Sequence, residues 1–248
     1  MSTVGQLSYR LFVALLILLA TLTIRAAAVS AVASEAEASE AAASDESQVC
    51  DPVADYYLGM EDYPDAIARH RVVIREHPDN ALAHYHLGFA YGMTGRHALE
   101  LRQYRAATRL GLSDWQLFVN LGIAYLAEGR ASDATEVMRL ATLLGPLQPA
   151  THLNLGLAYE RRAKYAAAEQ EILLSLSLDP NQVDARNTLG LLYAEEGRYK
   201  LAREEWSELL AADPDYTPAR KNLEILDHAG RDTQHAAPHR VVDLGRVR

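Results

Sequence analysis

Four pentapeptides at one spacing decide the fold: LGFAY at 87–91, LGIAY at 121–125, LGLAY at 155–159 and LGLLY at 189–193. Each begins 34 residues after the previous one. Self-similarity with a period of about 20 to 50 residues indicates small structural units that stack on their neighbours. The sequence therefore predicts a repeat protein rather than a compact globule around one cavity.

Positions outside the pentapeptides keep the same period. One period before Tyr91 stands Tyr57, which predicts a further unit ahead of the first pentapeptide. The sequence thus predicts five units, at about 47–80, 81–114, 115–148, 149–182 and 183–216. The recurring positions are Gly95, Gly129 and Gly197 with Ala163 in the same series, Ala134, Ala168 and Ala202, Pro146, Pro180 and Pro214, and in the first unit Tyr63, Ala66 and Pro78.

Each unit is predicted to consist of two helices joined by a tight turn, because its apolar residues recur three and four apart. Gly129 stands where the first helix of the third unit ends and a left-handed residue is needed. Pro146 closes that unit because proline cannot continue a helix. We expect Gly122 to face the small residue Ala134 where the helices approach most closely. The apolar stripes of this unit are Leu121, Ala124 and Tyr125, then Ala134, Met138 and Ala141.

This pattern of Leu, Gly and Tyr, a turn Gly, an Ala and a closing Pro resembles the tetratricopeptide repeat (TPR) over residues 47–216. The resemblance implies an all-α fold, a right-handed superhelical solenoid of tandem helix-turn-helix repeats. In it, residues 49–229 form one domain that ends in a capping helix over residues 217–229. Several packing positions depart from the family pattern, and there we expect local adjustment: Cys50, His84, His152 and Arg186 replace an aromatic residue, Leu112 a proline, and Glu100 a small residue.

The beginning of the chain has a different composition. Residues 11–24 are an uninterrupted apolar run, shorter than the about 20 residues of a membrane-spanning helix, and Ala31-Val32-Ala33 offers a small-residue cleavage site. We expect residues 1–33 to be a signal peptide, and the mature protein to be exported to a bacterial periplasm without membrane insertion. The alternative is an uncleaved N-terminal anchor that tethers the domain to the membrane. We expect residues 34–48 to be an acidic low-complexity linker and residues 230–248 a disordered tail.

Composition narrows the classes of function. The chain has 33 acidic and 24 basic residues, a formal charge of -9, and no long basic run, so nucleic acid is not an expected partner. The single cysteine, Cys50, excludes an internal disulfide and a cysteine-rich metal site. The HExxH, GxSxG, GxGxxG and Walker motifs do not occur, and the repeat assigns nearly every residue of the folded region to packing or to solvent. We therefore expect neither enzymatic activity nor a cofactor.

Histidine is the one surplus residue type, with nine in the chain. Packing of neighbouring units would bring His70 near His84, which leaves a metal site or a pH sensor as alternatives. However, His84 and His86 diverge by about 200° on a helix, and His70 and His84 replace aromatic residues of the family pattern. We expect the histidines to be structural or solvent-facing, with no metal bound. A histidine that contacts Glu100 would partner a buried carboxylate and stabilise the hairpin.

The resemblance also implies a binding surface, because the first helices of TPR arrays line the concave side of the solenoid. The predicted groove is apolar in its middle. The basic and amide residues with which some arrays clamp a C-terminal carboxylate are reduced to Arg161 and Asn187, so we expect an apolar or amphipathic protein segment as the ligand. The predicted groove residues are Tyr85, Phe89, Met93, Val119, Ile123, Leu126, Leu153, Leu157, Arg161, Asn187 and Leu191.

The sequence thus predicts a non-catalytic interaction scaffold or adaptor in the cell envelope, with envelope proteins as partners. An exposed apolar groove is typical of such an interface. One alternative is a self-associating structural protein whose groove is covered by the seam between first helices or by the apolar residues of the chain's own tail. A metal-binding or enzymatic component is the third class.

Overall fold

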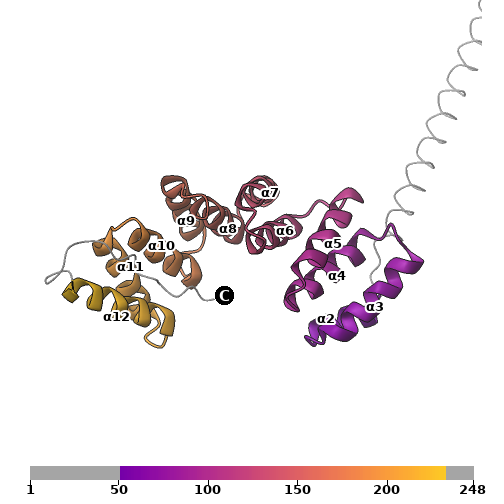
Figure 1. Ribbon diagram of the computed structural model, residues 1–248, viewed down its shortest axis with the longest axis horizontal. Helices are drawn as coiled ribbons and strands as arrows, with labels where there is room; N and C mark the ends of the chain where they lie inside the picture. The colour runs from indigo at the N-terminus through magenta and orange to yellow at the C-terminus, as the bar shows by residue number, and fades with distance from the viewer. Residues whose placement is uncertain (1–50, 233–248) are drawn as a thin grey trace, which may run out of the picture.

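The computed structural model describes residues 51–232, which form eleven α-helices and no strand. This confirms the predicted all-α repeat solenoid, and Figure 1 shows its hairpins following one another along an arc. The predicted segments 1–33 and 34–48 lie outside the described residues, as does the predicted tail from residue 233 onward, whereas residues 230–232 belong to the last helix. In chain order the helices are α2 (Pro52–Gly59), α3 (Tyr63–Glu76), α4 (Ala81–Met93), α5 (His97–Arg109), α6 (Trp115–Ala127), α7 (Ala131–Leu144), α8 (Pro149–Glu160), α9 (Tyr165–Leu178), α10 (Val183–Glu195), α11 (Tyr199–Ala212) and α12 (Thr217–Asp232).

The helices pack in two rows. Each first helix packs on the second helix of its own hairpin, and that second helix packs on the first helix of the next. Each first helix also contacts the following first helix, whereas no two second helices of the described part are in comparable contact. The first helices are therefore the closely spaced row and lie on the inner side of the arc, with α7 and α9 toward its outer side (Figure 1).

Short polar side chains begin several of these helices. The Asn80 side chain accepts a hydrogen bond from the backbone N–H of Ala83 at 2.9 Å, at the start of α4. Asp114 accepts one from Gln116 N–H at 2.7 Å, at the start of α6. These caps satisfy N–H groups that the helix itself leaves unpaired, and so they fix where these two first helices begin.

The turns inside the hairpins share a left-handed residue at one register position. Gly129 has a φ of 72°, as the sequence predicts, and Gly95 and Gly197 have values of 70° and 76°. Ala163 and Glu61 hold the same position in the fourth and first hairpins, with φ values of 54° and 58°. A left-handed conformation costs a residue with a side chain about 1–2 kcal/mol, so these two turns carry backbone strain.

The glycine of each pentapeptide faces a large side chain, and the side chain nearest to Gly122 is Met138 instead of the expected Ala134. A Cβ atom at position 122 would lie 2.6 Å from the Cγ and Cε atoms of Met138. Met138 is fully buried, so the missing Cβ admits the large residue into the crossing of α6 and α7. The same pairing recurs in the other hairpins as Gly88 with Tyr104, Gly156 with Ile172 and Gly190 with Trp206.

The departures from the family pattern at the start of the first helices are matched by the facing second helix. In the third hairpin, Phe118 and the partly buried Val137 pack together. At the same two register positions the second, fourth and fifth hairpins pair polar groups, so the side chains change together from apolar to polar. These pairs are His84 Nδ1 with Gln103 Oε1 at 2.7 Å, His152 Nδ1 with Glu171 Oε2 at 2.8 Å, and Arg186 NH1 with Glu205 Oε2 at 3.1 Å.

Glu100 is buried at the tight crossing of α4 and α5. Gly92 leaves room for it, because a Cβ atom at position 92 would lie 2.5 Å from Glu100 Oε1. His97 Nδ1 lies 2.9 Å from Glu100 Oε2. A histidine therefore partners this buried carboxylate, which was one of the possibilities drawn from the sequence. Burial raises the pKa of Glu100, and the hydrogen bond from His97 opposes that shift.

The last helix covers the end of the array. Ala219 and Leu226 of α12 are buried in the core that α10 and α11 form, whereas Lys221 and Glu224 are exposed. The helix thus buries an apolar side and presents a polar one, as a terminal cap requires. Between residues 51 and 232, no helix combines the length and the apolar character that a membrane span needs.

Candidate functional site

The structure places the predicted groove residues in three different environments. Val119 is buried beside Phe118 and Ala141, and Leu153 is buried in the C-terminal core with Ile172. These two side chains are 6% and 8% exposed, so they offer almost no surface to a ligand. The physical reason is that a first helix contacts neighbours on three sides, which leaves a narrow stripe for solvent.

Two further groove residues connect neighbouring first helices. The Tyr85 hydroxyl of α4 accepts a hydrogen bond from Asn120 Nδ2 of α6 at 3.0 Å. Asn187 Oδ1 of α10 accepts one from Asn222 Nδ2 of α12 at 3.3 Å. Part of the predicted groove is therefore the seam between repeats, which was one of the alternatives drawn from the sequence.

The remaining residues, apart from Arg161, are apolar side chains that lie at the surface of the first helices. The side chains of Met93 and Ile123 are 54% and 45% exposed. Phe89 is half-buried against Tyr63, with ring centroids 6.5 Å apart, and Arg161 is exposed at the end of α8. We call the following set the concave stripe: Phe89, Met93, Ile123, Leu126, Leu157 and Leu191.

Exposed leucines also occur on the second helices, where the sequence prediction did not place a surface. Leu143 and Leu147 are 75% and 76% exposed at and after the end of α7, and Leu173 and Leu174 of α9 are also exposed. The helical stripe pattern does not reveal them, because leucine fits equally well in a core and next to solvent. They provide a comparison surface for the concave stripe.

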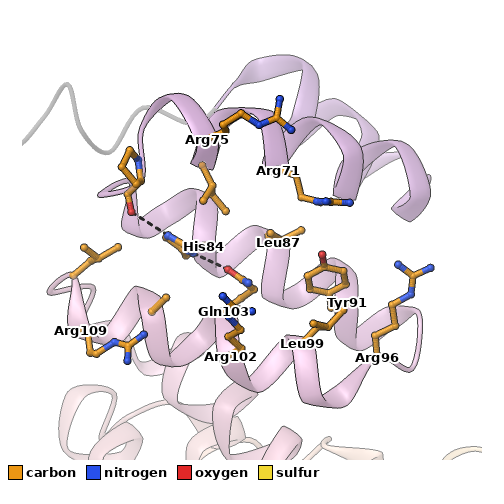
Figure 2. A pocket seen from close by; sticks show the side chains of 14 residues that line it. Arg71, Arg75, His84, Leu87, Tyr91, Arg96, Leu99, Arg102, Gln103 and Arg109 are labelled. Atoms are coloured by element: carbon orange, nitrogen blue, oxygen red, sulfur yellow. Dashed lines mark hydrogen bonds between the residues drawn. The ribbon is translucent and has the colours of Figure 1, made fainter.

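A cleft rich in arginine lies between α3, α4 and α5, with a volume of about 800 Å³. Figure 2 shows Arg71 and Arg75 on one wall and Arg96, Arg102 and Arg109 on the opposite side. We call these five residues the arginine cleft. All five are exposed, none of them pairs with a carboxylate within residues 51–232, and no acidic residue lines the cleft.

The floor of the arginine cleft is ordered by hydrogen bonds. His84 Nδ1 lies 2.7 Å from Gln103 Oε1, and His84 Nε2 lies 3.2 Å from the Pro78 carbonyl oxygen (Figure 2). Leu99 and Leu110 add exposed apolar surface, above the buried Leu87 and Tyr91. The sequence prediction missed this cleft because its arginines come from separate helices, although Arg75 and Arg109 stand one period apart.

Three potential metal ligands meet where α2, α3 and α4 pack together. His70 lies beside His86, with ring centroids 5.4 Å apart, and not beside His84 as the sequence suggested. His86 Nδ1 lies 2.8 Å from Asp55 Oδ1. We call Asp55, His70 and His86 the histidine cluster.

The electrostatics of this cluster differ from those of an exposed histidine pair. His70 is fully buried, and neither of its ring nitrogens has a hydrogen-bond partner. Burial and the neighbouring His86 lower the pKa of His70 to about 4, so its imidazole is neutral at pH 7. A neutral buried imidazole offers a lone pair and no charge.

Comparison with solved structures agrees with this architecture. No curated protein sequence matches the chain. The similar solved structures described next share 19–23% of their residues with this chain, and similarity at that level shows the fold alone. Similar structures are MamA (TM-score 0.60, 20% identity, covering 66% of this chain and 95% of MamA), the TPR protein YrrB (TM-score 0.60, 19% identity, 69% and 88%) and PilF of Pseudomonas aeruginosa (TM-score 0.61, 23% identity, 73% and 83%).

The family is shown by a sequence model as well as by the fold. The model for the tetratricopeptide repeat matches residues 54–114, 119–183 and 153–217, which together cover more than half of the chain. The matched segments contain the four pentapeptides and the glycines that admit Tyr104, Met138, Ile172 and Trp206. The chain belongs to the tetratricopeptide repeat family.

Proposed function

We propose that this protein is a non-catalytic scaffold of the cell envelope that binds an apolar or amphipathic segment of another protein along the concave stripe. The TPR fold supports a role in binding other proteins or peptides. The observation that carries the choice of surface is the exposure of Met93 and Ile123 on two first helices, next to the half-buried Phe89 and Leu126. Large apolar side chains gathered on one surface are typical of an interface.

The similarity to YrrB, a TPR protein with an unusual peptide-binding site, is consistent with a peptide ligand. The ligand we propose is a helix or extended segment with apolar residues on one side, because the stripe is narrow and the polar seam residues Asn120 and Asn222 stand between repeats. Arg161 at the end of α8 adds one positive charge beside the stripe.

Cross-linking in cells, followed by identification of the partners, tests this function. We expect Met93→Glu with Ile123→Glu to remove a defined partner while circular dichroism shows unchanged helix content, because both side chains face solvent. The matched control is Leu143→Glu with Leu147→Glu. These two leucines, at and after the end of α7, are more exposed than Met93 and Ile123 and lie outside the concave stripe. A partner list that stays the same in the first variant and shrinks in the control would contradict the proposal.

The competing function is self-association with a groove covered by the chain's own tail. Light scattering of the mature chain tests self-association. Deletion of residues 230–248 tests whether the tail covers the groove. If the tail covers the stripe, its deletion increases the binding of a dye that detects exposed apolar surface. We expect a monomer and no change in dye binding.

Export completes the proposal. The apolar run at 11–24 and the small residues at 31–33 support cleavage and a periplasmic location. Sequencing of the N-terminus of the protein from a periplasmic fraction tests this, with a new N-terminus near residue 34 expected. An intact N-terminus in the membrane fraction would instead support the anchored alternative.

The arginine cleft favours a second function, the binding of an acidic protein segment on the outer side of the N-terminal repeats. Five arginines without carboxylate partners, in a chain of charge -9, create a local positive potential. The volume of about 800 Å³ and the exposed apolar side chains of Leu99 and Leu110 suit a peptide that carries both carboxylates and apolar side chains. Acidic partners are attracted by such a field, and salt weakens the attraction.

A glutamate-rich peptide is the probe for this second function. We expect its binding to weaken steeply between low and physiological salt and to be lost with Arg75→Gln and Arg102→Gln. Arg139→Gln with Lys200→Gln removes two exposed charges elsewhere and serves as the control. Binding that survives the cleft variant would contradict the assignment, and tighter binding after deletion of residues 34–48 would show that the chain's own acidic linker competes for the cleft.

A further inference from the structure

Three unusual residues of the N-terminal repeats come together in space. Asp55 of α2, His70 of α3 and His86 of α4 each offer one ligand atom, and these atoms lie within 4.8 Å of one another. The repeat itself provides the comparison, because every other hairpin shows what normally occupies each position. Each of the three positions can therefore be compared with the equivalent positions of the other units.

At all three register positions the cluster residue is the exception. The counterparts of Asp55 are apolar, those of His70 are large residues without an imidazole, and those of His86 are proline in the first unit and short amide or hydroxyl residues in the later ones. None of these counterparts brings three metal-binding side chains together. The counterparts are Phe89, Ile123, Leu157, Leu191 and Ile225 for Asp55, Tyr104, Met138, Ile172 and Trp206 for His70, and Pro52, Asn120, Asn154, Thr188 and Asn222 for His86.

The ring nitrogens of His70 are unsatisfied, which is unusual for a side chain whose only role is to fill space. His70 is fully buried, and both ring nitrogens lack a partner. Buried polar atoms in proteins nearly always have a hydrogen-bond partner, and leaving one unpaired costs about 1–3 kcal/mol. Trp206 shares the unpaired state at the same register position, but its indole N–H is only a donor and cannot bind a metal.

The donor set selects the class of ion. Two imidazoles and one carboxylate suit Zn²⁺ and the neighbouring divalent transition metals, whereas Mg²⁺ and Ca²⁺ prefer oxygen ligands alone. His86 and Asp55 are only half-buried, which leaves a path for an ion to enter.

We propose that Asp55, His70 and His86 form a binding site for a divalent transition metal ion, with Zn²⁺ as its probe. Three protein ligands leave at least one coordination position for water or for a ligand from a partner. The ion would join α2, α3 and α4 at one point, and so would fasten the first hairpin to the second. The proposal is independent of what the concave stripe binds.

The test is a titration of the full mature chain, without a histidine tag, with Zn²⁺ by isothermal calorimetry. We expect one ion per chain and a saturable rise in Tm of about 5 °C or more when free Zn²⁺ exceeds Kd about 100-fold. His70→Tyr and His86→Asn install the residues that the second and third hairpins use, so both variants keep the shape of the repeat. Each should abolish the stoichiometric binding and the Tm shift.

His152→Asn is the matched control, because His152 also lies 2.8 Å from a carboxylate, that of Glu171, but outside the cluster. It should bind Zn²⁺ as the wild type does. Absence of stoichiometric binding in the wild type would overturn the proposal. So would binding that persists in folded His70→Tyr and His86→Asn, or binding that is lost in His152→Asn.

Discussion

The carboxylate of Glu100 on α5 occupies the space that Gly92 leaves open on α4. In the third hairpin the same two positions hold Leu126 and Ala134, so the large and the small residue have changed places. The crossing keeps its combined volume while the chemistry changes from apolar to ionisable. Repeats of one chain thus compensate a departure from the family pattern inside the same hairpin.

This exchange predicts strong coupling between the two positions. Gly92→Leu alone should destabilise the protein by about 1–3 kcal/mol, because the new side chain collides with Glu100. Adding Glu100→Ala should recover most of that loss, because the pair then matches Leu126 and Ala134 of the third hairpin. Urea unfolding of the single and double variants measures the coupling. Additive effects would show that the two side chains do not share the space.

The pH dependence of stability should carry a contribution from Glu100. Because burial raises its pKa above the usual 4.5, the folded state holds this proton at a higher pH than the unfolded chain does. Its contribution to stability is therefore complete below pH 4.5 and is lost as the pH rises through the folded pKa. Glu100→Gln does not titrate, so its stability relative to wild type should increase between pH 4 and pH 7.5 (~3.5 units). Glu136→Gln, at an exposed position on α7, controls for the loss of a charge; a fall in the relative stability of Glu100→Gln would contradict the sign.

Backbone strain at the fourth turn gives a stabilising substitution. Ala163 has a φ of 54° at the position that Gly129 holds in the third hairpin. Ala163→Gly should raise the unfolding free energy by about 0.5–1 kcal/mol, because relief of the left-handed strain exceeds the added entropy of the unfolded chain. Gly129→Ala is the reciprocal change and should lower it. Equal stability of both variants and the wild type, measured by chemical denaturation, would show that the turns carry no strain.

The glycines of the pentapeptides should differ in their tolerance of alanine. A Cβ atom at position 190 would lie 2.7 Å from the Cε2 atom of Trp206, and the rigid indole has no means to yield. At position 122 the obstacle is Met138, whose flexible side chain can rotate away. Gly190→Ala should therefore lower Tm more than Gly122→Ala. Gly59→Ala, with nothing within 4 Å of the added Cβ, should not lower it. The opposite order of Tm values would contradict the packing described for the two crossings.

The architecture could be predicted from the sequence because the residues that make each packing contact recur from unit to unit, at the same spacing. The spacing of the pentapeptides located each hairpin, and the turn residue Gly129 has the predicted conformation. The partner of Gly122 could not be predicted in the same way. The stripe on the second helix offered Ala134 and Met138 equally, and only the rotation of α7 about its axis places Met138 at the crossing.

The candidate sites were less predictable because they depend on how helices meet. Val119 was assigned to a groove by its place in the unit, yet its side chain packs beside Ala141. His86 rather than His84 meets His70, because α4 turns that face toward α3 while His84 pairs with Gln103. Such choices follow from helix rotations of a fraction of a turn, which residue spacing alone does not define.

The most direct test of the central claim, that the concave stripe binds a protein segment, is site-specific photo-cross-linking in cells. A photoreactive phenylalanine analogue placed at Ile123 should yield a discrete cross-linked partner, because this side chain is 45% exposed on the inner side of the arc. The same analogue at Leu143, which is 75% exposed on α7, should not yield that partner. Cross-links from Leu143 without any from Ile123 would place the binding surface on the outer helices and contradict the account.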